Sequence, residues 1–153
     1  KPMVYGDLTA MENLEFFAKL YGVPDARNRI LDLLELVELD HRRNDAARTF
    51  SRGMTQRLSI ARALINDPAI VLLDEPYSGL DPHAMQLFDE LIARVRQGRT
   101  FVMVSHDLDK GYELASHALI LAAGRVVCFD EKAALEREAF RKLYLSTVGM
   151  GVA

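Results

Sequence analysis

The sequence predicts an α/β fold in which an all-helical part precedes a part that alternates strands and helices. Residues 7–66 carry apolar side chains at helical spacing, whereas residues 67–130 hold short apolar runs separated by a helical pattern. A strand, a helix and a second strand in succession form one right-handed unit with parallel strands. We therefore expect a helical subdomain over residues 1–66 and a sheet-containing part over residues 67–153.

Composition limits the class of protein. The 153 residues are 50% hydrophobic and 27% charged, with a net charge of −3, which indicates one folded globular domain and excludes a disordered or fibrous chain. No apolar run approaches the ~20 residues that cross a bilayer, and the charge does not favour nucleic acid as a partner. Cys128 is the only cysteine, so no disulfide can form within the chain, and a small buried side chain in a reducing cytoplasm is predicted.

Two helices are predicted in the first part of the chain. Thr9 and Glu12 form a capping box at the start of the first helix, and Gly22 ends it. Pro24 suits the first turn of the second helix. That helix has an apolar stripe at Ile30, Leu33, Leu34 and Val37.

A third helix and a strand follow. Residues 40–50 are polar and predict a loop, after which Ser51 predicts the N-cap of a helix that ends at Asp67 and Pro68. The next residues, 69–73, are all apolar, and Asp74 closes the run. A strand that is apolar on both faces is typical of a central parallel strand covered on each side.

The remaining elements follow from the same patterns. Pro82 begins a helix that reaches about Gln97. After it come a second strand over residues 100–104, a short helix near residues 109–116, a hairpin around Ala123-Gly124 and a closing helix over residues 131–145.

Two adjacent carboxylates, Asp74 and Glu75, stand at the end of the first predicted strand. Ligands bind at the carboxyl ends of strands in open α/β sheets. Such a pair suits phosphoryl transfer, because one carboxylate can hold Mg²⁺ while the other faces an attacking water. His106 ends the next strand, so these three side chains are expected to converge on one rim of the sheet. The alternative is a strand that simply ends in polar residues and a structural histidine.

The segment Ser51-Arg52-Gly53-Met54 places a serine and a glycine at a helix N-terminus. Free N–H groups and the positive end of the helix dipole attract anions there, and Gly53 lets a phosphate approach the backbone closely. The alternative is an ordinary helix cap.

Four segments in order resemble the motifs of the nucleotide-binding subunit of ATP-binding cassette (ABC) transporters. They are Ser-Arg-Gly-Met at 51–54, Leu-Leu-Asp-Glu-Pro at 72–76, Ser-Gly-Leu-Asp at 78–81 and Ser-His-Asp at 105–107. The resemblance covers nearly the whole chain. It implies part of a P-loop NTPase (RecA-like) core with parallel strands, carrying the Walker B, D-loop and H-loop segments, plus an inserted all-helical subdomain that carries the signature motif.

The resemblance also implies roles for the residues that follow the strands. Asp74 would organise Mg²⁺, and Glu75 would polarise the water that attacks ATP. His106 would contact the γ-phosphate. Ser78 and Asp81 would link the two nucleotide sites across a dimer.

The signature motif is implied to act on ATP held by the partner subunit, with Ser51 and Gly53 at its γ-phosphate. It departs from the family's usual Ser-Gly-Gly-Gln at Arg52 and Met54. Met54 cannot return a hydrogen bond to the cap as glutamine could, whereas Arg52 adds a cation beside the anion site. This variant is similar to exporter-type cassettes, including the haem-exporter group.

A glycine-rich loop with Gly-Lys-Ser/Thr, which would cradle the phosphates, is absent from these 153 residues. In the family this loop precedes the helical subdomain. We therefore expect the chain to be the C-terminal portion of a cassette, which by itself neither binds nor hydrolyses ATP appreciably and associates through uncovered apolar faces.

The predicted function is the ATP-binding subunit of an ABC transporter, which uses ATP and Mg²⁺ and couples hydrolysis to transport. Its partners would be a membrane-spanning subunit and a second nucleotide-binding subunit, without nucleic acid, at the cytoplasmic face of the cell membrane. One alternative is a soluble ABC-type ATPase that acts on DNA or ribosomes, which the net charge of −3 disfavours. The other is a non-catalytic interaction module, which Asp74, Glu75 and His106 disfavour.

Overall fold

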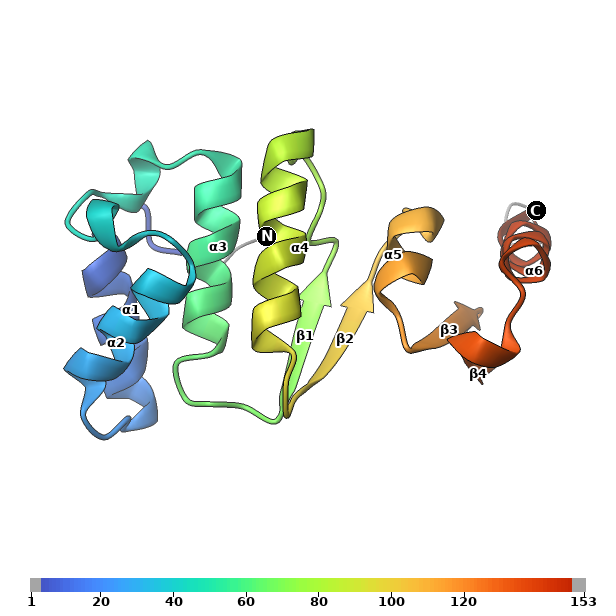
Figure 1. Ribbon diagram of the computed structural model, residues 1–153, viewed down its shortest axis with the longest axis horizontal. Helices are drawn as coiled ribbons and strands as arrows, with labels where there is room; N and C mark the ends of the chain where they lie inside the picture. Colours follow the sequence, from blue (N-terminus) through green and yellow to red (C-terminus); the bar gives the residue numbers. More distant parts are fainter. Residues whose placement is uncertain (1–3, 150–153) are drawn as a thin grey trace. The chain divides into compact units, whose positions relative to one another are not determined.

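The computed structural model describes residues 4–149 (Figure 1). The chain divides into two compact units, of which the first ends at Met103 and the second begins at Val104. The first unit contains α1 (Ala10–Tyr21), α2 (Ala26–Leu36), α3 (Arg52–Ala63), β1 (Ile70–Asp74), α4 (Pro82–Val95) and most of β2 (Thr100–Val104). The second contains α5 (Leu108–Leu114), β3 (His117–Ala122), β4 (Arg125–Glu131) and α6 (Arg137–Gly149). The subdomain boundary at residue 66 is a different division and stays a prediction.

The predicted capping box at the start of α1 is present. Glu12 N donates to Thr9 Oγ1 at 3.1 Å, and Thr9 N donates to Glu12 Oε2 at 2.8 Å. These hydrogen bonds from Thr9 lower the pKa of Glu12. Gly22 ends the helix with φ of 65°, a left-handed conformation that glycine adopts without strain.

The apolar stripe of α2 is buried as predicted, but the prediction for Pro24 is wrong. The N-cap of α2 is Asp25, so Pro24 lies outside the first turn. The reason is the end of α1, where Val23 N donates to Ala18 O at 2.9 Å and holds the chain in a tight cap. The chain then needs Pro24 and Asp25 to reverse direction before a helix can begin.

The segment predicted as a loop, residues 40–50, contains two 3₁₀ turns, Asp40–Arg42 and Ala47–Thr49. Its backbone is tied to the residues that precede α1, because Ala47 N donates to Leu8 O at 2.9 Å and Arg48 N to Gly6 O at 2.8 Å. These bonds fix the position from which α3 begins.

Asn13 is the buried polar side chain of α1, with an exposed fraction of 1%. Its Oδ1 accepts from Tyr5 N at 2.8 Å, and its Nδ2 donates to Tyr5 O at 3.0 Å and to Thr9 O at 2.9 Å. One amide thus satisfies backbone groups on both sides of the turn into α1. The Tyr5 ring stacks on Phe17, with 6.1 Å between ring centroids.

Glu38, just after α2, connects three helices of the first unit. Its carboxylate binds Arg94 of α4 at 2.9 Å and lies 3.6 Å from Arg57 of α3. Arg57 also donates to Val37 O at 2.9 Å, and desolvation by burial lowers its pKa. These contacts join the helical group to α4, which leads into β2 (Figure 1).

The two strands of the first unit, β1 and β2, pair in parallel, and α4 connects them. Val71 and Leu73 of β1 are buried, whereas Ile70 and Leu72 are 61% and 75% exposed. Cover on both faces of β1 is therefore not found among residues 4–149, and one apolar face stays open, as expected for a chain with uncovered apolar faces. The strand alternates because α4, whose buried side includes Phe88 and Leu91, packs on one face of a strand–helix–strand unit.

The second unit is built on the predicted hairpin. β3 and β4 pair antiparallel, and Ala122 faces Arg125 across a two-residue turn at Ala123-Gly124. Both turn residues have positive φ, as a type I′ turn requires. The hairpin packs on α6 through a core of Ala118, Ile120, Cys128 and Phe140.

Cys128 is buried as predicted, and its desolvation and the neighbouring Asp130 raise its pKa. The closing helix, however, begins at Arg137 and reaches Gly149, later than predicted, because Lys132–Ala134 form a separate 3₁₀ turn. Leu135 O after this turn accepts from Tyr112 Oη at 2.6 Å and holds the chain on α5 before α6 starts. No helix within residues 4–149 combines the length and the apolar character needed to cross a membrane.

We predict that Asn13→Ala lowers the free energy of unfolding by about 2 kcal/mol, because the buried amide of Asn13 is lost and the backbone groups of Tyr5 and Thr9 lose their partner. Urea unfolding followed by circular dichroism measures the change. The control is Asn28→Ala at an exposed position of α2. There a single hydrogen bond to Asp25 is lost, and the change should stay within about 0.5 kcal/mol. Equal effects of the two substitutions would contradict the structural role of Asn13.

Candidate functional site

The signature segment forms the start of α3 as predicted. Ser51 is the N-cap, and its Oγ accepts from Met54 N at 3.2 Å. Met54 returns no hydrogen bond to Ser51, in contrast to Glu12 at the start of α1, because a thioether side chain is a very weak acceptor. The N–H groups of Arg52 and Gly53 have no acceptor within the helix, since the first turn of any helix lacks them. Ser51 and Arg52 are exposed, so this turn is open to an anion from outside the unit.

Asp74 and Glu75 lie where β1 ends. Asp74 shares the open face of β1 with Ile70 and Leu72, since side chains alternate along a strand and these three positions are exposed. Glu75 is half-buried and has φ of 45°, a left-handed conformation that is strained for a residue with a side chain. The backbone therefore turns at Glu75, directly after the strand ends.

The loop from Glu75 to Asp81 is held by hydrogen bonds along its own backbone. Ser78 N donates to Glu75 O and Leu80 N to Tyr77 O, each at 3.1 Å. Asp81 then caps α4, with its Oδ1 accepting from Ala84 N at 2.8 Å. Ser78 and Asp81 are both exposed, as side chains must be to reach a second subunit.

Tyr77 anchors this loop to α4. Its ring is buried with 5% exposed, stands edge-on to Phe88 with 5.1 Å between centroids, and its hydroxyl donates to Asp89. The sequence analysis did not identify Tyr77 or Asp89 as part of the site. An aromatic residue directly after Asp-Glu-Pro, twelve residues before an acid on an amphipathic helix, is the signal that could have found them.

Gly79, in the middle of the loop, lies against Arg52 of the signature segment. Its φ of 73° suits glycine, and a β-carbon built on it would lie only 3.1 Å from Arg52 Cζ and 3.4 Å from Cδ. The guanidinium therefore occupies the space that a side chain at position 79 would need. Arg52 was predicted to add a cation beside the anion site, and the structure places that cation along the Gly79 backbone.

Gly53 makes a second close approach between the same segments. A β-carbon built on it would lie 3.0 Å from Ala84 Cβ, on the first turn of α4. The small residues let the first turns of α3 and α4 approach closely, so the structure brings Ser51, Arg52 and Gly53 together with the loop that follows Glu75.

His106 belongs to the second unit, where it lies between β2 and α5. Its neighbours order this corner, because Asp107 N donates to Ser105 Oγ at 3.1 Å and Asp107 caps α5 by accepting from Lys110 N at 3.1 Å. His106 itself is exposed. Asp74 and Glu75 belong to the first unit, so the convergence of His106 with them stays a prediction.

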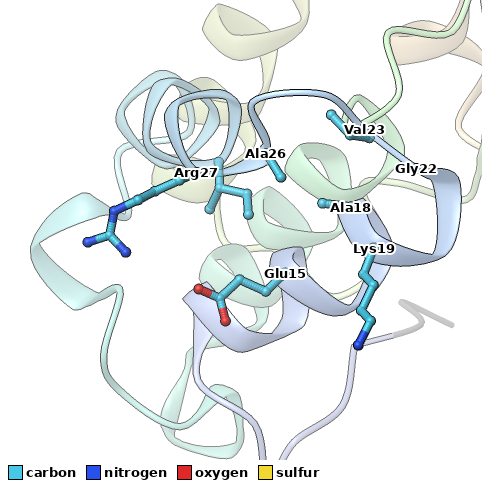
Figure 2. Close-up of a pocket in the computed structure, with 8 residues that line it drawn as sticks. Glu15, Ala18, Lys19, Gly22, Val23, Ala26 and Arg27 are labelled. Carbon is cyan, nitrogen blue, oxygen red and sulfur yellow. The ribbon is translucent and has the colours of Figure 1, made fainter.

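A cleft among the described residues lies elsewhere, around the turn between α1 and α2, with a volume of about 550 Å³ (Figure 2). Its charged side chains come from Glu15, Lys19 and Arg27, and apolar residues such as Ala18 and Val23 also line it. It contains no residue of the predicted site.

Comparison with known proteins identifies the family. Residues 2–78 match the family model described as ABC transporter. The chain therefore belongs to the ABC transporter family, and the predicted resemblance and α/β P-loop NTPase fold are confirmed. The narrower similarity to haem exporters stays a prediction.

Two curated relatives and one solved structure show the extent of the likeness. "ABC transporter A family member 8" of Dictyostelium discoideum is 41% identical over 125 residues, which are 80% of this chain and 15% of that protein. "Nod factor export ATP-binding protein I" of Cupriavidus metallidurans is 36% identical over 124 residues, 79% of this chain and 41% of that protein. A solved "Structure of ATP binding subunit of ABC transporter" is 27% identical with a TM-score of 0.78, and covers 96% of this chain and 65% of that one. The chain thus spans less than half the length of these curated relatives.

We predict that Ser51→Ala destabilises the start of α3 by about 1 kcal/mol, because the N–H of Met54 loses its acceptor. Ser51→Asp should preserve the helix, since a carboxylate also caps and favours the helix dipole. Amide hydrogen exchange at Met54 measures both effects. Equal exchange at Met54 in the Ser51→Ala variant and the unsubstituted protein would contradict the capping role.

Proposed function

We propose that this chain is part of the ATP-binding subunit of a transporter and that the complete protein couples ATP hydrolysis to movement of a substrate across a membrane. The observation that carries the proposal is the close packing of the signature turn on the loop that follows Asp74 and Glu75. Membership of the ABC transporter family indicates that the nucleotide is ATP. The relatives, which include an export ATP-binding protein, favour a transporter.

The residues at the end of β1 fit Mg²⁺ bound together with a nucleotide. Among the described residues no group of three or more His, Cys, Asp and Glu side chains could enclose a metal ion. Mg²⁺ does not need such a cage, because it keeps several waters and takes one or two carboxylates plus phosphate oxygens. Asp74 offers a carboxylate on an open face of the strand and would be its protein ligand.

Glu75 is the proposed water-orienting residue. It follows Asp74 directly, and its backbone turns there with a left-handed φ of 45°. A carboxylate there would accept a proton from the water that attacks the γ-phosphate. Mg²⁺ bound together with ATP would neutralise the charge that develops on the transferred phosphoryl group, and His106 is proposed as a further γ-phosphate contact.

The signature turn is proposed to serve the ATP of a second nucleotide-binding subunit. Ser51 and Arg52 are exposed. The N–H groups of the first turn of α3 have no acceptor within the helix and would bind an external anion. Ser78 and Asp81 are exposed beside them and would meet the same partner. A dimer of such subunits would place one ATP between each signature turn and the opposite subunit.

A membrane-spanning subunit is the second proposed partner, and it would hold the protein at the cytoplasmic face of the membrane. Tyr5, Phe16 and Phe17 form an aromatic cluster, with 5.3 Å between the ring centroids of Tyr5 and Phe16. Phe17 is buried, but Tyr5 and Phe16 remain 47% and 46% exposed. About half of Tyr5 and about half of Phe16 thus stay exposed, and they form an apolar surface to which a short helix would bind.

We predict that Glu75→Gln in the full-length protein lowers the turnover of Mg-ATP by ~10²-fold or more, the scale of losing a general base. ATP binding should persist and trap a dimer, because the amide keeps the shape of the side chain. Steady-state hydrolysis and light scattering with ATP measure the two effects.

The matched control for this experiment is Glu90→Gln, an exposed carboxylate on α4 that accepts a hydrogen bond from Gln86. Its turnover should equal that of the unsubstituted protein. Normal steady-state hydrolysis by Glu75→Gln would overturn the role of Glu75.

We predict that Tyr5→Cys, in a Cys128→Ala background, crosslinks in native membranes to a membrane-spanning protein, because the position lies on the exposed aromatic surface. Mass spectrometry of the crosslinked product identifies the partner. Asn28→Cys in the same background is the control, since it is exposed on α2 outside the cluster and should give no such product. Equal labelling at both positions would argue against docking at Tyr5.

A further inference from the structure

The short helix α5 follows His106 almost directly. It has seven residues, Leu108–Leu114, with Gly111 among them. Isolated helices shorter than about 12 residues are marginal in water, and a glycine costs a helix about 1 kcal/mol relative to alanine. The helix therefore depends on the residues against which it packs. Because His106 precedes the N-cap Asp107, the same packing determines where the backbone at His106 lies.

Leu108 and Tyr112 form the face of α5 that packs on the rest of the second unit. They are four positions apart, so they lie on one side of the helix, and both pack against the core that the hairpin shares with α6. Tyr112 makes the more specific contacts. Its hydroxyl donates to Leu135 O at 2.6 Å, and its ring centroid lies 5.8 Å from that of the buried Phe140.

Polar contacts hold both ends of α5. At its start, Asp107 Oδ1 accepts from Lys110 N at 3.1 Å. At its end, Lys132 Nζ donates to Glu113 O at 2.8 Å, and the same ammonium lies 5.0 Å from the centroid of the Tyr112 ring. The groups that surround Tyr112 thus come from the chain that follows β4.

We propose that Tyr112 is a positioning residue: by holding α5 on the residues between Lys132 and Phe140, it fixes His106 for contact with the γ-phosphate. The inference rests on the proposed function for the nucleotide and for the role of His106. Tyr112 acts through α5 and its cap Asp107, without contact to ATP. Hydrolysis by the complete protein then depends on a segment that lies well after the nucleotide-binding motifs.

The alternative is that Tyr112 only adds to the apolar core of the second unit. Tyr144 provides the matched control, because it is also a half-buried tyrosine and packs against the same core from α6. Tyr144→Ala should weaken this core as Tyr112→Ala does. Only Tyr112→Ala removes the contact of α5 with Leu135 O.

The first experiment observes His106 without nucleotide. In the full-length protein with isotope-labelled histidine, the NMR signal of the His106 ring is identified by its loss in His106→Gln. Tyr112→Ala should shift this signal, and Tyr112→Phe, which keeps the ring and loses the bond to Leu135 O, should shift it less. The signal of His83, on α4 in the first unit, should not change.

Two outcomes of this experiment would overturn the proposal. One is an unchanged His106 signal in Tyr112→Ala. The other is an equal shift in Tyr144→Ala, which would assign the effect to a general loss of packing in the second unit.

The second experiment measures hydrolysis in the full-length protein. Turnover of Mg-ATP should fall about tenfold in Tyr112→Ala and about threefold in Tyr112→Phe, while the KM for ATP changes less than about twofold, because the other nucleotide contacts remain. Tyr144→Ala should keep turnover within about twofold of the unsubstituted protein. Equal losses in Tyr112→Ala and Tyr144→Ala would contradict a positioning role.

A double-mutant cycle with His106→Ala tests the path, under single-turnover conditions that detect slow hydrolysis. Tyr112→Ala should have little further effect in His106→Ala, whereas additive losses would show that Tyr112 does not act through His106. Absence of hydrolysis in the unsubstituted protein would overturn the proposed function, and the His106 signal would still decide whether Tyr112 positions this residue.

Discussion

The close approach of two helix starts organises the site. The first turn of α3 meets the first turn of α4 at Gly53 and Ala84, where even one added carbon would stand 3.0 Å from its neighbour. Each turn is capped by its own side chain, Ser51 for α3 and Asp81 for α4. Because both helices are long enough to bury an apolar side, their starts are fixed by packing far from the site. The motifs at those starts therefore share one rigid frame.

The helical group owes its order to polar contacts placed at its turns. Asn13 satisfies the backbone at the entry to α1, and Glu38 binds arginines of α3 and α4 at the exit from α2. Asp67, before β1, binds Arg99, which holds the pKa of that carboxyl below its usual range. Glu38 and Asp67 join segments far apart in the sequence, whereas Asn13 acts on residues close to it in the chain. The apolar stripes supply burial, and the polar side chains select one arrangement of the helices.

Local signals in the sequence predicted where helices begin and end better than they predicted which segments pack against them. Capping residues and glycines predicted the ends of α1 and the start of α3, because they act within three or four residues. Pro24 and the start of α6 were misplaced, since a helix cap and a hydrogen bond from Tyr112 at a distance of 23 residues decide them. The motif residues that follow β1 and β2 and those at the start of α3 were proposed from their order and type, and their roles stay predictions. The contact of Arg52 with Gly79 was not, because no local pattern encodes where a long side chain lies.

The left-handed backbone at Glu75 lowers the stability of the fold at the residue that is proposed to orient the attacking water. Glutamate adopts φ of 45° at a cost of roughly 1–2 kcal/mol, and glycine would remove most of that strain. Glu38 shares this conformation, with φ of 58°, and its carboxylate binds two arginines. Substitution by glycine at position 75 relaxes the backbone and deletes the carboxylate in one step. If Glu75 has its proposed role, a glycine there would raise stability and lower turnover in the same protein.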